Sequence, residues 1–471
     1  MKSKRVKIRL SIVFATMAFV LLQQVPLNAQ QLNRFSVKQA VDYALKNSVD
    51  VKNALLNLQI QKQTNREITS AAFPQISGGV SANYFPNVAV QSFPNFIAAA
   101  TYGVLEKERV KDGNGNSIIS PSDFGFLQAQ FGTNYTASGG VDISQLLFDG
   151  QVFVGLQARD ASLDFIKKQT AVTEEMINVN VQKIYYQLVV GRQQITSIDA
   201  NIDRFQKLLT DTKEIYNNGF AEKLDVDKVS VQLNNLLTEK LKVENQLRAG
   251  NASLKFLLNM PQKDTLVLID SLTEEELKNN ILDKNYNYSD RKEYQLLEVG
   301  KKLGEYNIKR YQLSYLPTVA LYGNYYKNAQ RNKFNFFNDG QWFTSSLIGM
   351  KISVPIFDGF AKAARVNKTK LELQQTNNTM EQLKAAIDND VVQANLKFSS
   401  SIITMDNQKK NMELAAKVYN TTKLKYEQGL GSNQEIYAAQ TELKVSQNNY
   451  YGALYDAIIA KIDFLKAVGK L

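Results

Sequence analysis

Apolar residues recur with a period of seven in two long stretches of the chain, about 210 positions apart. A strict repeat of seven predicts α-helices that supercoil left-handedly against their neighbours. The first stretch runs from Gln151 to Tyr216, 66 residues, which at 1.5 Å per residue would span about 100 Å. Such a helix is too long for an ordinary globular domain. The repeat positions are Val181, Leu188, Ile195, Ile202, Leu209 and Tyr216, and then Val391, Phe398, Met405, Met412, Tyr419 and Tyr426.

Each stretch ends at a glycine turn and is followed by one apolar stripe with spacings of three and four, which predicts a return helix. Two helical hairpins are therefore expected, over 151–259 and 359–468. The second return helix carries smaller residues, which favours a closer helix approach. The first stripe is Val226, Val229, Leu233, Leu236, Val243, Leu247, Leu254 and Leu257, and the second is Ile436, Ala439, Leu443, Tyr450, Ala453, Ala457, Ala460 and Phe464.

The repetition extends beyond the hairpins. Phe148-Asp149-Gly150 recurs as Phe357-Asp358-Gly359, and Leu254-Lys255-Phe256-Leu257 recurs as Ile462-Asp463-Phe464-Leu465. A repeat this long indicates a duplicated architectural unit rather than a short-period solenoid. The two copies are predicted over 30–259 and 289–471, with 260–288 as the linker between them. Each copy begins with a helix that runs into a proline, over 36–72 and 289–314.

Four segments between the helices alternate apolar with polar or small residues, which predicts β-strands over 73–86, 131–147, 316–327 and 342–356. A glycine- and serine-containing loop is expected between the members of each pair. Period two over ten or more residues fits a strand with one face to lipid and one to a lumen, although a soluble hairpin sheet would alternate similarly. Aromatic residues near the strand ends are candidates for interfacial girdles. They are Phe73, Tyr84, Phe85, Tyr315, Tyr325, Tyr326, Trp342 and Phe343.

Closure of these strands determines the expected assembly. No apolar run of spanning length follows residue 30, so entry into a membrane would require a β-barrel. Four strands cannot close a barrel, and an open edge in lipid leaves backbone groups unpaired at several kcal/mol each. Two, three or four chains would supply 8, 12 or 16 strands, and a wide aqueous channel favours more than eight. The pattern alone does not choose between three and four chains.

The first 29 residues read as a signal peptide. A basic segment up to Arg9 precedes an apolar run over Leu10–Leu22, and Ala29 is a plausible cleavage point. Its removal would lower the formal charge from +11 to +6, because five basic residues lie within it. The mature chain is thus only mildly basic, and it contains no concentrated Lys/Arg tract interleaved with aromatics. Nucleic acid is therefore not expected as a partner.

Composition limits the chemistry. The 471 residues include neither cysteine nor histidine, which excludes zinc and iron–sulfur sites built on those ligands and Ser-His or Cys-His nucleophiles. We expect no enzyme activity, no cofactor and no catalytic or metal-binding residues. The acid groups Glu174-Glu175 and Glu274–Glu276 are interpreted as solvated helix faces. Residues 112–123 space their oxygens like a calcium loop, but Ser117 replaces the expected glycine, so a polar hairpin tip is favoured.

In the order and spacing of these features, residues 36–470 resemble the TolC family of outer-membrane efflux proteins. The strongest residues are the repeated tips, Tyr216-Asn-Asn-Gly219-Phe220 and Tyr426-Glu-Gln-Gly429-Leu430. The resemblance implies a mostly α-helical homotrimer whose hairpins form an α-helical barrel across the periplasm. Four strands per chain would complete a trimeric 12-stranded β-barrel in outer-membrane lipid. A periplasmic adaptor and an inner-membrane pump would dock at the tips, and the duct would be a passive conduit gated there.

The resemblance also assigns roles to individual residues. Gly219 with Phe220, and Gly429 with Leu430, match the tip motif that meets the adaptor. Tyr216, Asp225, Tyr426 and Glu435 match positions at the tunnel mouth, where three like carboxylates in a ring would favour cations.

Two positions depart from the family pattern. Gly431 stands where an arginine can hold the mouth closed, so the sequence does not show what holds this mouth closed. Ala438 stands where a second ring acid can follow, so the strength of cation selectivity is not determined either. The transported substrate is also left open. The alternative reading is a surface-tethered structural coiled-coil protein, which heptads alone would favour. A carboxylate-only hydrolase would need an acidic site that no spacing here suggests.

Overall fold

The computed structural model describes residues 32–270, 277–278, 285–338 and 340–471. The chain forms two compact units. Unit 1 contains the residues up to Gln61 together with Ala161–Lys301 and Gln374–Leu471, and unit 2 contains Lys62–Asp160 and Lys302–Leu373. The predicted signal peptide, 1–29, and the acids Glu274–Glu276 lie outside the described residues.

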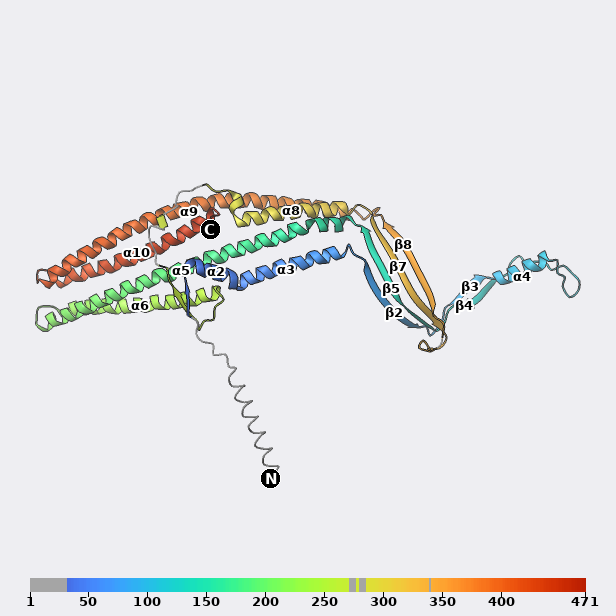
Figure 1. Ribbon diagram of the computed structural model, residues 1–471, viewed down its shortest axis with the longest axis horizontal. Helices are drawn as coiled ribbons and strands as arrows, with labels where there is room; N and C mark the ends of the chain where they lie inside the picture. Colours follow the sequence, from blue (N-terminus) through green and yellow to red (C-terminus); the bar gives the residue numbers. More distant parts are fainter. Residues whose placement is uncertain (1–31, 271–276, 279–284, 339) are drawn as a thin grey trace, which may run out of the picture. The chain divides into compact units, whose positions relative to one another are not determined.

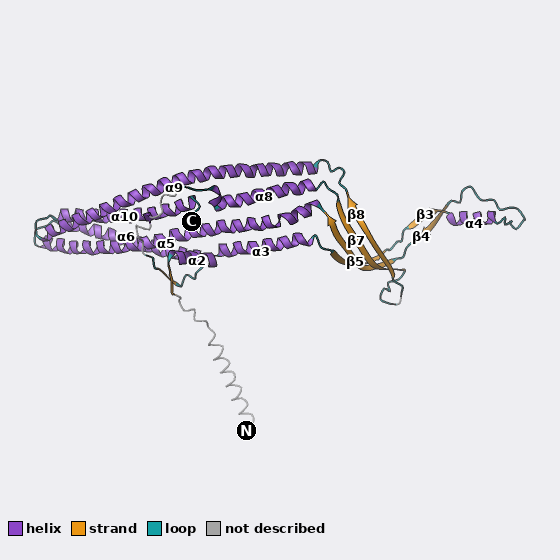
Figure 2. Ribbon diagram, turned by 45° about the horizontal axis from the view of Figure 1, so that its top comes forward, coloured by secondary structure: helices purple, strands orange, loops and turns teal. Residues whose placement is uncertain are grey.

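Unit 1 is built around two helical hairpins. The first pairs α5 (Gly150–Asn217) with α6 (Lys223–Leu257), and the second pairs α9 (Ala361–Glu427) with α10 (Asn433–Ala467). Unit 1 holds α5 from Ala161 and α9 from Gln374. Figures 1 and 2 show the members of each hairpin running side by side. The predicted hairpins covered 151–259 and 359–468.

The heptad residues, except the exposed Tyr216, lie in or against the core between these helices. One hydrophobic cluster joins all four: Phe205 of α5 and Leu236 of α6 are fully buried, with Tyr419 of α9 and Leu443 of α10 against them. The small residues of α10, among them Ala457 and Ala460, are completely covered. The two copies of the repeat therefore stabilise each other by burying their apolar stripes together.

A short parallel sheet ties the beginning of the chain to the linker. β1 (Leu32–Phe35) pairs with β6 (Thr265–Leu268), in register from Leu32↔Thr265 to Phe35↔Leu268. The hydroxyl of Tyr185 on α5 donates to the Phe35 carbonyl at 2.9 Å and accepts from the Asp270 N–H at 3.3 Å. Burial raises the pKa of Tyr185, so this phenol stays protonated and continues to donate.

The single helix predicted over 36–72 is wrong, because the chain forms α2 (Val37–Asn47) and α3 (Val49–Ser70). Ser48 interrupts the helix with ψ 139°, and Asn259 Nδ2 donates to the exposed Asn47 carbonyl at 3.1 Å. Asn and Ser compete with the helix for backbone hydrogen bonds, which makes this pair a natural breaking point.

The helix predicted over 289–314 is also divided. A 3₁₀ turn, η1 (Tyr288–Asp290), precedes α8 (Lys292–Leu313), and Arg291 between them has an extended backbone with ψ 126°. The guanidinium of Arg291 is buried in unit 1, and its contacts explain the break, since they hold the residue outside the helix.

Unit 2 contains a four-stranded antiparallel sheet in the order β2-β5-β7-β8 (Figure 1). The strands are β2 (Gln75–Tyr84), β5 (Tyr135–Phe148), β7 (Thr318–Arg331) and β8 (Phe343–Ser353), close to the predicted ranges. β5 pairs with β7 from Tyr135↔Arg331 onwards, so the central pair joins the two repeats. Among the described residues, β2 and β8 are each paired on one side only.

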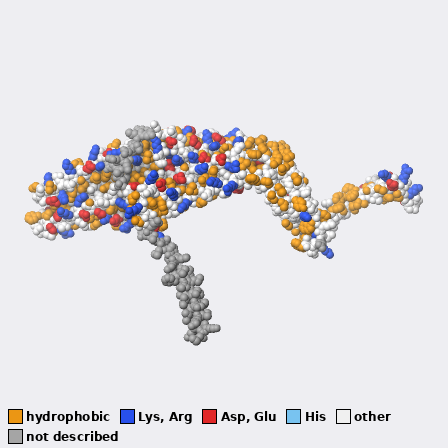
Figure 3. All heavy atoms as spheres, in the orientation of Figure 1, with side chains coloured by type: hydrophobic (Ala, Val, Ile, Leu, Met, Phe, Trp, Pro, Cys, Tyr) orange, Lys and Arg blue, Asp and Glu red, His pale blue; other side chains and the backbone are white. Residues whose placement is uncertain are grey.

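The two faces of this sheet differ chemically. One face carries exposed apolar side chains from all four strands: Ile76, Val80, Tyr84, Val141, Ile143, Leu321, Tyr325, Ile348, Met350 and Ile352. The other face carries hydrogen-bonded polar pairs across the strands. These are Ser81–Ser138 at 2.8 Å, Asn328–Ser345 at 2.9 Å, and Tyr326 with Asp142. Figure 3 shows hydrophobic side chains gathered over the sheet on the face in view.

The loop predicted between the first two strands is more structured than expected. It contains β3 (Val90–Pro94), α4 (Phe96–Lys107) and β4 (Phe126–Gln130), with β3 and β4 antiparallel. The overlooked signal is the uncharged run from Phe96 to Leu105, which is ten residues long and mostly apolar.

The polar segment 112–123 begins at a hairpin turn, closed by a bridge between Lys111 and Ser117. Asp112 Oδ1 accepts from the Asn116 and Asn114 N–H groups at 2.8 and 2.9 Å, and these bonds lower the pKa of Asp112. Within the described residues, no group of three or more acids is placed to hold a metal ion. No described helix combines the length and apolarity needed to cross a membrane.

Candidate functional site at the hairpin tips

Both hairpin tips end their first helix in the same way. At the first tip, Gly219 N–H donates to the Tyr216 carbonyl at 2.9 Å and Phe220 N–H donates to the Ile215 carbonyl at 3.0 Å. At the second tip, Gly429 N–H donates to the Tyr426 carbonyl at 3.0 Å and Leu430 N–H to the Lys425 carbonyl at 2.9 Å. This pair of bonds is the Schellman arrangement, which satisfies the last carbonyls of a helix.

Backbone conformation, rather than space, requires these glycines. Gly219 has φ +81° and Gly429 has φ +75°. This left-handed conformation is strained for any residue that carries a Cβ. A Cβ added at either position would meet nothing within 4 Å. The repeated Tyr-x-x-Gly-apolar signal therefore specifies a turn geometry.

That geometry projects one apolar side chain from each tip into solvent. Phe220 is 86% exposed and Leu430 is 77% exposed in the single chain. Large apolar groups this exposed at the end of a rigid hairpin are candidates for contact with another protein.

The two predicted mouth acids have different surroundings. Asp225 accepts from the Glu222 N–H at 3.4 Å and lies 3.9 Å from Lys228 Nζ, so its partners are local to α6. At the second tip, Ser432 Oγ caps α10 by accepting from the Glu435 N–H at 3.2 Å, and the Glu435 side chain is exposed. Asp225 is thus not held by residue 431, where this chain has glycine.

The two mouth tyrosines also differ. Tyr216 is exposed, whereas Tyr426 packs against the four-helix cluster of unit 1. Burial, and then the nearby Asp211 carboxylate, raise the pKa of Tyr426. The second tyrosine is therefore a packing residue as well as a tip residue, a difference that the repeat did not reveal.

Polar contacts that the sequence did not predict link the two hairpins near the tips. Lys207 on α5 lies 3.7 Å from Glu427 on α9, and Thr212 Oγ1 donates to Asn433 Oδ1 at 3.0 Å. Farther along the hairpins, Glu239 on α6 accepts from Asn448 at 2.6 Å and from Lys444 at 2.9 Å, both on α10. Equivalent positions of a repeat need not touch, so the spacing gave no sign of these pairs.

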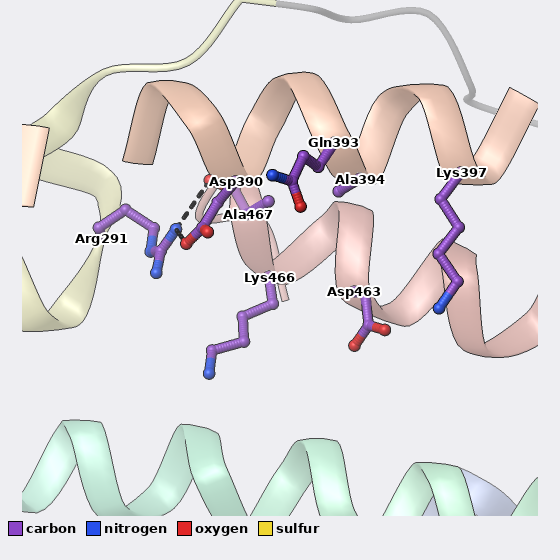
Figure 4. Close-up of a pocket in the computed structure, with 8 residues that line it drawn as sticks. All are labelled: Arg291, Asp390, Gln393, Ala394, Lys397, Asp463, Lys466 and Ala467. Carbon is purple, nitrogen blue, oxygen red and sulfur yellow. Dashed lines mark hydrogen bonds and ion pairs between the residues drawn. The ribbon is translucent and has the colours of Figure 1, made fainter. Parts of the chain in front are cut away.

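A second polar cluster in unit 1 surrounds Arg291 and borders a pocket of about 380 Å³ (Figure 4). Arg291 donates from Nη1 to the Ala467 carbonyl at 3.2 Å and from Nε to Glu293 Oε2 at 3.3 Å. Asp390 lies 3.8 Å from Nη1. Burial acts to raise the pKa of Glu293, but the Arg291 hydrogen bond and the neighbouring cations outweigh it, and the pKa falls below its usual value.

Glu175 of α5 contradicts the prediction of a solvated acid pair, because its side chain is buried. Burial, and then repulsion from Glu293, raise its pKa. The heptad pattern did not predict this burial, because charged residues in such a pattern are assigned to the solvent-facing side of the helix. Glu174 beside it remains partly exposed.

Comparisons with known proteins agree with this architecture. The family profile described as "Outer membrane efflux protein" matches residues 297–470, from α8 to the end of α10. The outer membrane protein TolC of Vibrio cholerae is 20% identical over 338 residues, which cover 71% of this chain and 77% of that protein. Residues 297–470 thus match the outer membrane efflux protein family, and TolC of Vibrio cholerae is a distant relative over most of the chain. The location that these similarities indicate is the outer membrane, with the helical hairpins on its periplasmic side.

Solved structures of outer membrane channels share the fold. The CusC channel superposes with a TM-score of 0.72 at 16% identity, covering 92% of each chain. The CmeC outer membrane channel of Campylobacter jejuni superposes with a TM-score of 0.71 at 15% identity, covering 92% of this chain and 85% of CmeC. Agreement over nearly the whole chain at such low identity means that the architecture, rather than individual side chains, is what these efflux proteins have in common.

We expect Gly219→Ala to destabilise the first tip by about 1–2 kcal/mol, because alanine at φ +81° is strained. Gly452→Ala is the matched control, since its Cβ would also meet nothing within 4 Å but its φ is not positive. The control should leave stability unchanged or raise it by about 0.5–1 kcal/mol. Thermal unfolding in detergent, followed by circular dichroism, measures both. Equal effects would contradict the turn argument.

We expect Glu175→Gln to stabilise the protein at pH 7.5. The folded-state pKa of Glu175 is raised, so its contribution to stability is full below the unfolded pKa and is lost as the pH rises through the folded pKa, where the buried carboxyl ionises. The glutamine variant should melt about 1–2 °C higher at pH 7.5, with the difference vanishing near pH 4. Glu174→Gln is the control and should change nothing. A lower melting point for Glu175→Gln would mean that nearby cations hold the carboxylate ionised.

Proposed function

We propose that the chain is one subunit of a passive exit duct in the outer membrane, part of a tripartite efflux or secretion system. Three copies pool their strands into a 12-stranded β-barrel, and their hairpins continue the bore as an α-helical barrel. The duct performs no chemistry of its own, and the partner pump supplies the energy. The proposal assigns no catalytic residue, cofactor or metal.

The four-stranded sheet is the observation that carries this proposal. Its apolar face is exposed on all four strands, its polar face is hydrogen-bonded across strands, and its edge strands β2 and β8 are paired on one side only among the described residues. Lipid cannot satisfy the backbone groups of an open edge. Pairing β8 of one copy with β2 of the next removes both edges and places the apolar face toward lipid and the polar face toward the lumen.

The tips are proposed to meet a periplasmic adaptor, which connects the duct to an inner-membrane pump. Phe220 and Leu430 support this role, because each is an exposed apolar group fixed by a Schellman turn. Tips fixed in this way lose little conformational freedom on docking, which lowers the entropic cost of binding.

The mouth is proposed to lie near Asp225 and Glu435, with Tyr216 and Tyr426 beside them. Three copies would bring six carboxylates around one axis, which favours the passage of cations. Because Asp225 is engaged by Lys228 on its own helix, Glu435 is expected to contribute the stronger field. In place of a latch by an arginine at position 431, the closed state is proposed to depend on the contacts between hairpins, such as Lys207–Glu427 and Thr212–Asn433.

Neighbouring residues on opposite faces of β8 test the barrel. Ile348→Lys places a charge on the apolar face and should reduce the yield of assembled protein in the outer membrane, at a cost of about 2–4 kcal/mol near the bilayer midplane. Leu347→Lys alters the polar face and should assemble normally while shifting ion selectivity toward anions. Native mass spectrometry gives the assembly, and planar-bilayer recording gives conductance and selectivity.

If both variants reduced the yield of assembled protein to the same extent, the assignment of the two faces would be contradicted. Wild-type material that stayed monomeric and water-soluble without detergent, and that formed no channels, would instead favour a surface-tethered structural coiled-coil protein.

Substitution at the tips tests adaptor docking. Phe220→Ser and Leu430→Ser should each weaken binding of the cognate adaptor about tenfold or more, the loss expected for one desolvated apolar anchor. Phe256→Ser is the control, because that side chain is 78% exposed at the other end of α6. Trimer assembly and conductance should stay unchanged in all three variants. Adaptor binding that survives loss of both tip residues would overturn this part of the proposal.

A further inference from the structure

The segment 85–134, here called the excursion, extends the sheet of unit 2 beyond the ends of β2 and β5. Phe85 N–H donates to the Asn134 carbonyl at 2.7 Å, Asn134 Nδ2 donates to the Phe85 carbonyl at 3.0 Å, and Gln130 Nε2 donates to the Val88 carbonyl at 3.2 Å. These bonds lead into the β3–β4 pair, from Val90↔Gln130 to Pro94↔Phe126. The helix α4 follows directly, capped by Asn95, which accepts from the Ala98 N–H at 3.0 Å.

One side of α4 packs on the excursion itself. Ala98, Tyr102 and Leu105 are partly covered, and the ring of Tyr102 lies 5.7 Å from the ring of Phe124. At about 100° per residue these three positions share one face of the helix.

The opposite side of α4 is apolar and open. At the same angular spacing, Phe96, Ile97, Ala100 and Val104 lie together on it, and all four are exposed. No charged residue occurs between Phe96 and Leu105, and a Cβ at Gly103 would meet nothing within 4 Å. Figure 3 shows hydrophobic side chains along β3 and β4 and charged ones toward the far end of the excursion.

With this face open, the excursion is only marginally stable in water. A helix of about 12 residues is marginal without packing, and an isolated two-stranded hairpin is marginal as well. The ordered excursion therefore requires a surface that covers its apolar side.

We propose that copies of α4 cover one another, so that three excursions pack face to face over the outer mouth of the duct. This inference depends on the proposed trimer. β2, from which the excursion departs, is an edge strand, so the excursion emerges beside the proposed subunit contact. β3 adds about 17 Å and α4 about 18 Å beyond the sheet. The connection from Asn332 to Trp342 is much shorter, so among the described residues only another excursion reaches α4.

Three-fold symmetry then brings three identical apolar faces of α4 together. Each copy presents the same face at the same height around one axis, and the small residues Ala100 and Gly103 allow the helices to approach closely. The result is a three-helix cap at the exit, which must part when cargo leaves.

A pair of cysteine variants tests this cap, because the chain has no cysteine of its own. Ala100→Cys lies on the open face, and Ala98→Cys lies half a helical turn away on the covered face. After oxidation of isolated outer membranes with copper phenanthroline, Ala100→Cys should form at least ten times more disulfide-linked dimer than Ala98→Cys. Adding Phe96→Ser, Ile97→Ser and Val104→Ser to Ala100→Cys should remove the dimer.

Native mass spectrometry of the same samples separates this inference from the proposed function. A trimer in which both cysteines cross-link equally poorly overturns the cap while leaving the duct intact. A label on Ala100→Cys that is quenched by brominated lipid overturns it in favour of membrane burial. Absence of any trimer overturns both the cap and the proposed duct. The single alanine-to-cysteine changes are small enough to keep the test valid if the serine variant fails to fold.

Discussion

The constraint on which the proposed architecture depends is the need of every extended backbone group for a hydrogen-bond partner. In the single chain, β5 and β7 are paired on both sides, whereas β2 and β8 are each paired on one side among the described residues. The apolar face of the same sheet is uncovered. Assembly in a membrane covers both, since a ring of copies pairs the edge strands and lipid covers the apolar face of the sheet. In the proposed oligomer, the edge strands therefore obtain the hydrogen-bond partners that they lack in the single chain.

Unit 1 differs from the sheet, since the apolar stripes of its helices are already buried against one another within one chain. Phe205, Leu236, Tyr419 and Leu443 come from four helices and share a single cluster. Duplication made this possible, because two amphipathic hairpins with the same period can pack together where one would leave its stripe open. The copies have nevertheless diverged. Tyr216 is exposed while Tyr426 is packed, so equivalent positions do not have equivalent roles.

A buried arginine lies in unit 1 where the second repeat begins. Arg291 interrupts the helix there, and its guanidinium satisfies the Ala467 carbonyl near the end of α10. The same cation stabilises Glu293 as a carboxylate, and the charge of Glu293 in turn disfavours ionisation of the buried Glu175. One arginine therefore ties the beginning of α8 to the end of α10 and favours the ionised form of Glu293, whereas burial is the main cause of the raised pKa of Glu175. Buried ion pairs of this kind are costly to break singly, because each leaves an uncompensated charge.

The sequence by itself determined the long helices, the four strands of the main sheet and the turns at the tips. Heptads predict the long helices, period-two alternation predicts the four strands, and Tyr-x-x-Gly-apolar predicts both turns, because each is a local or strictly periodic constraint on the backbone. Tertiary structure alone decided the rest. The break at Ser48, the parallel pairing of β1 with β6, the burial of Glu175 and the partners of Asp225 depend on which segments meet in space. Periodicity records which face of an element is apolar, but it carries no information about which neighbour covers that face.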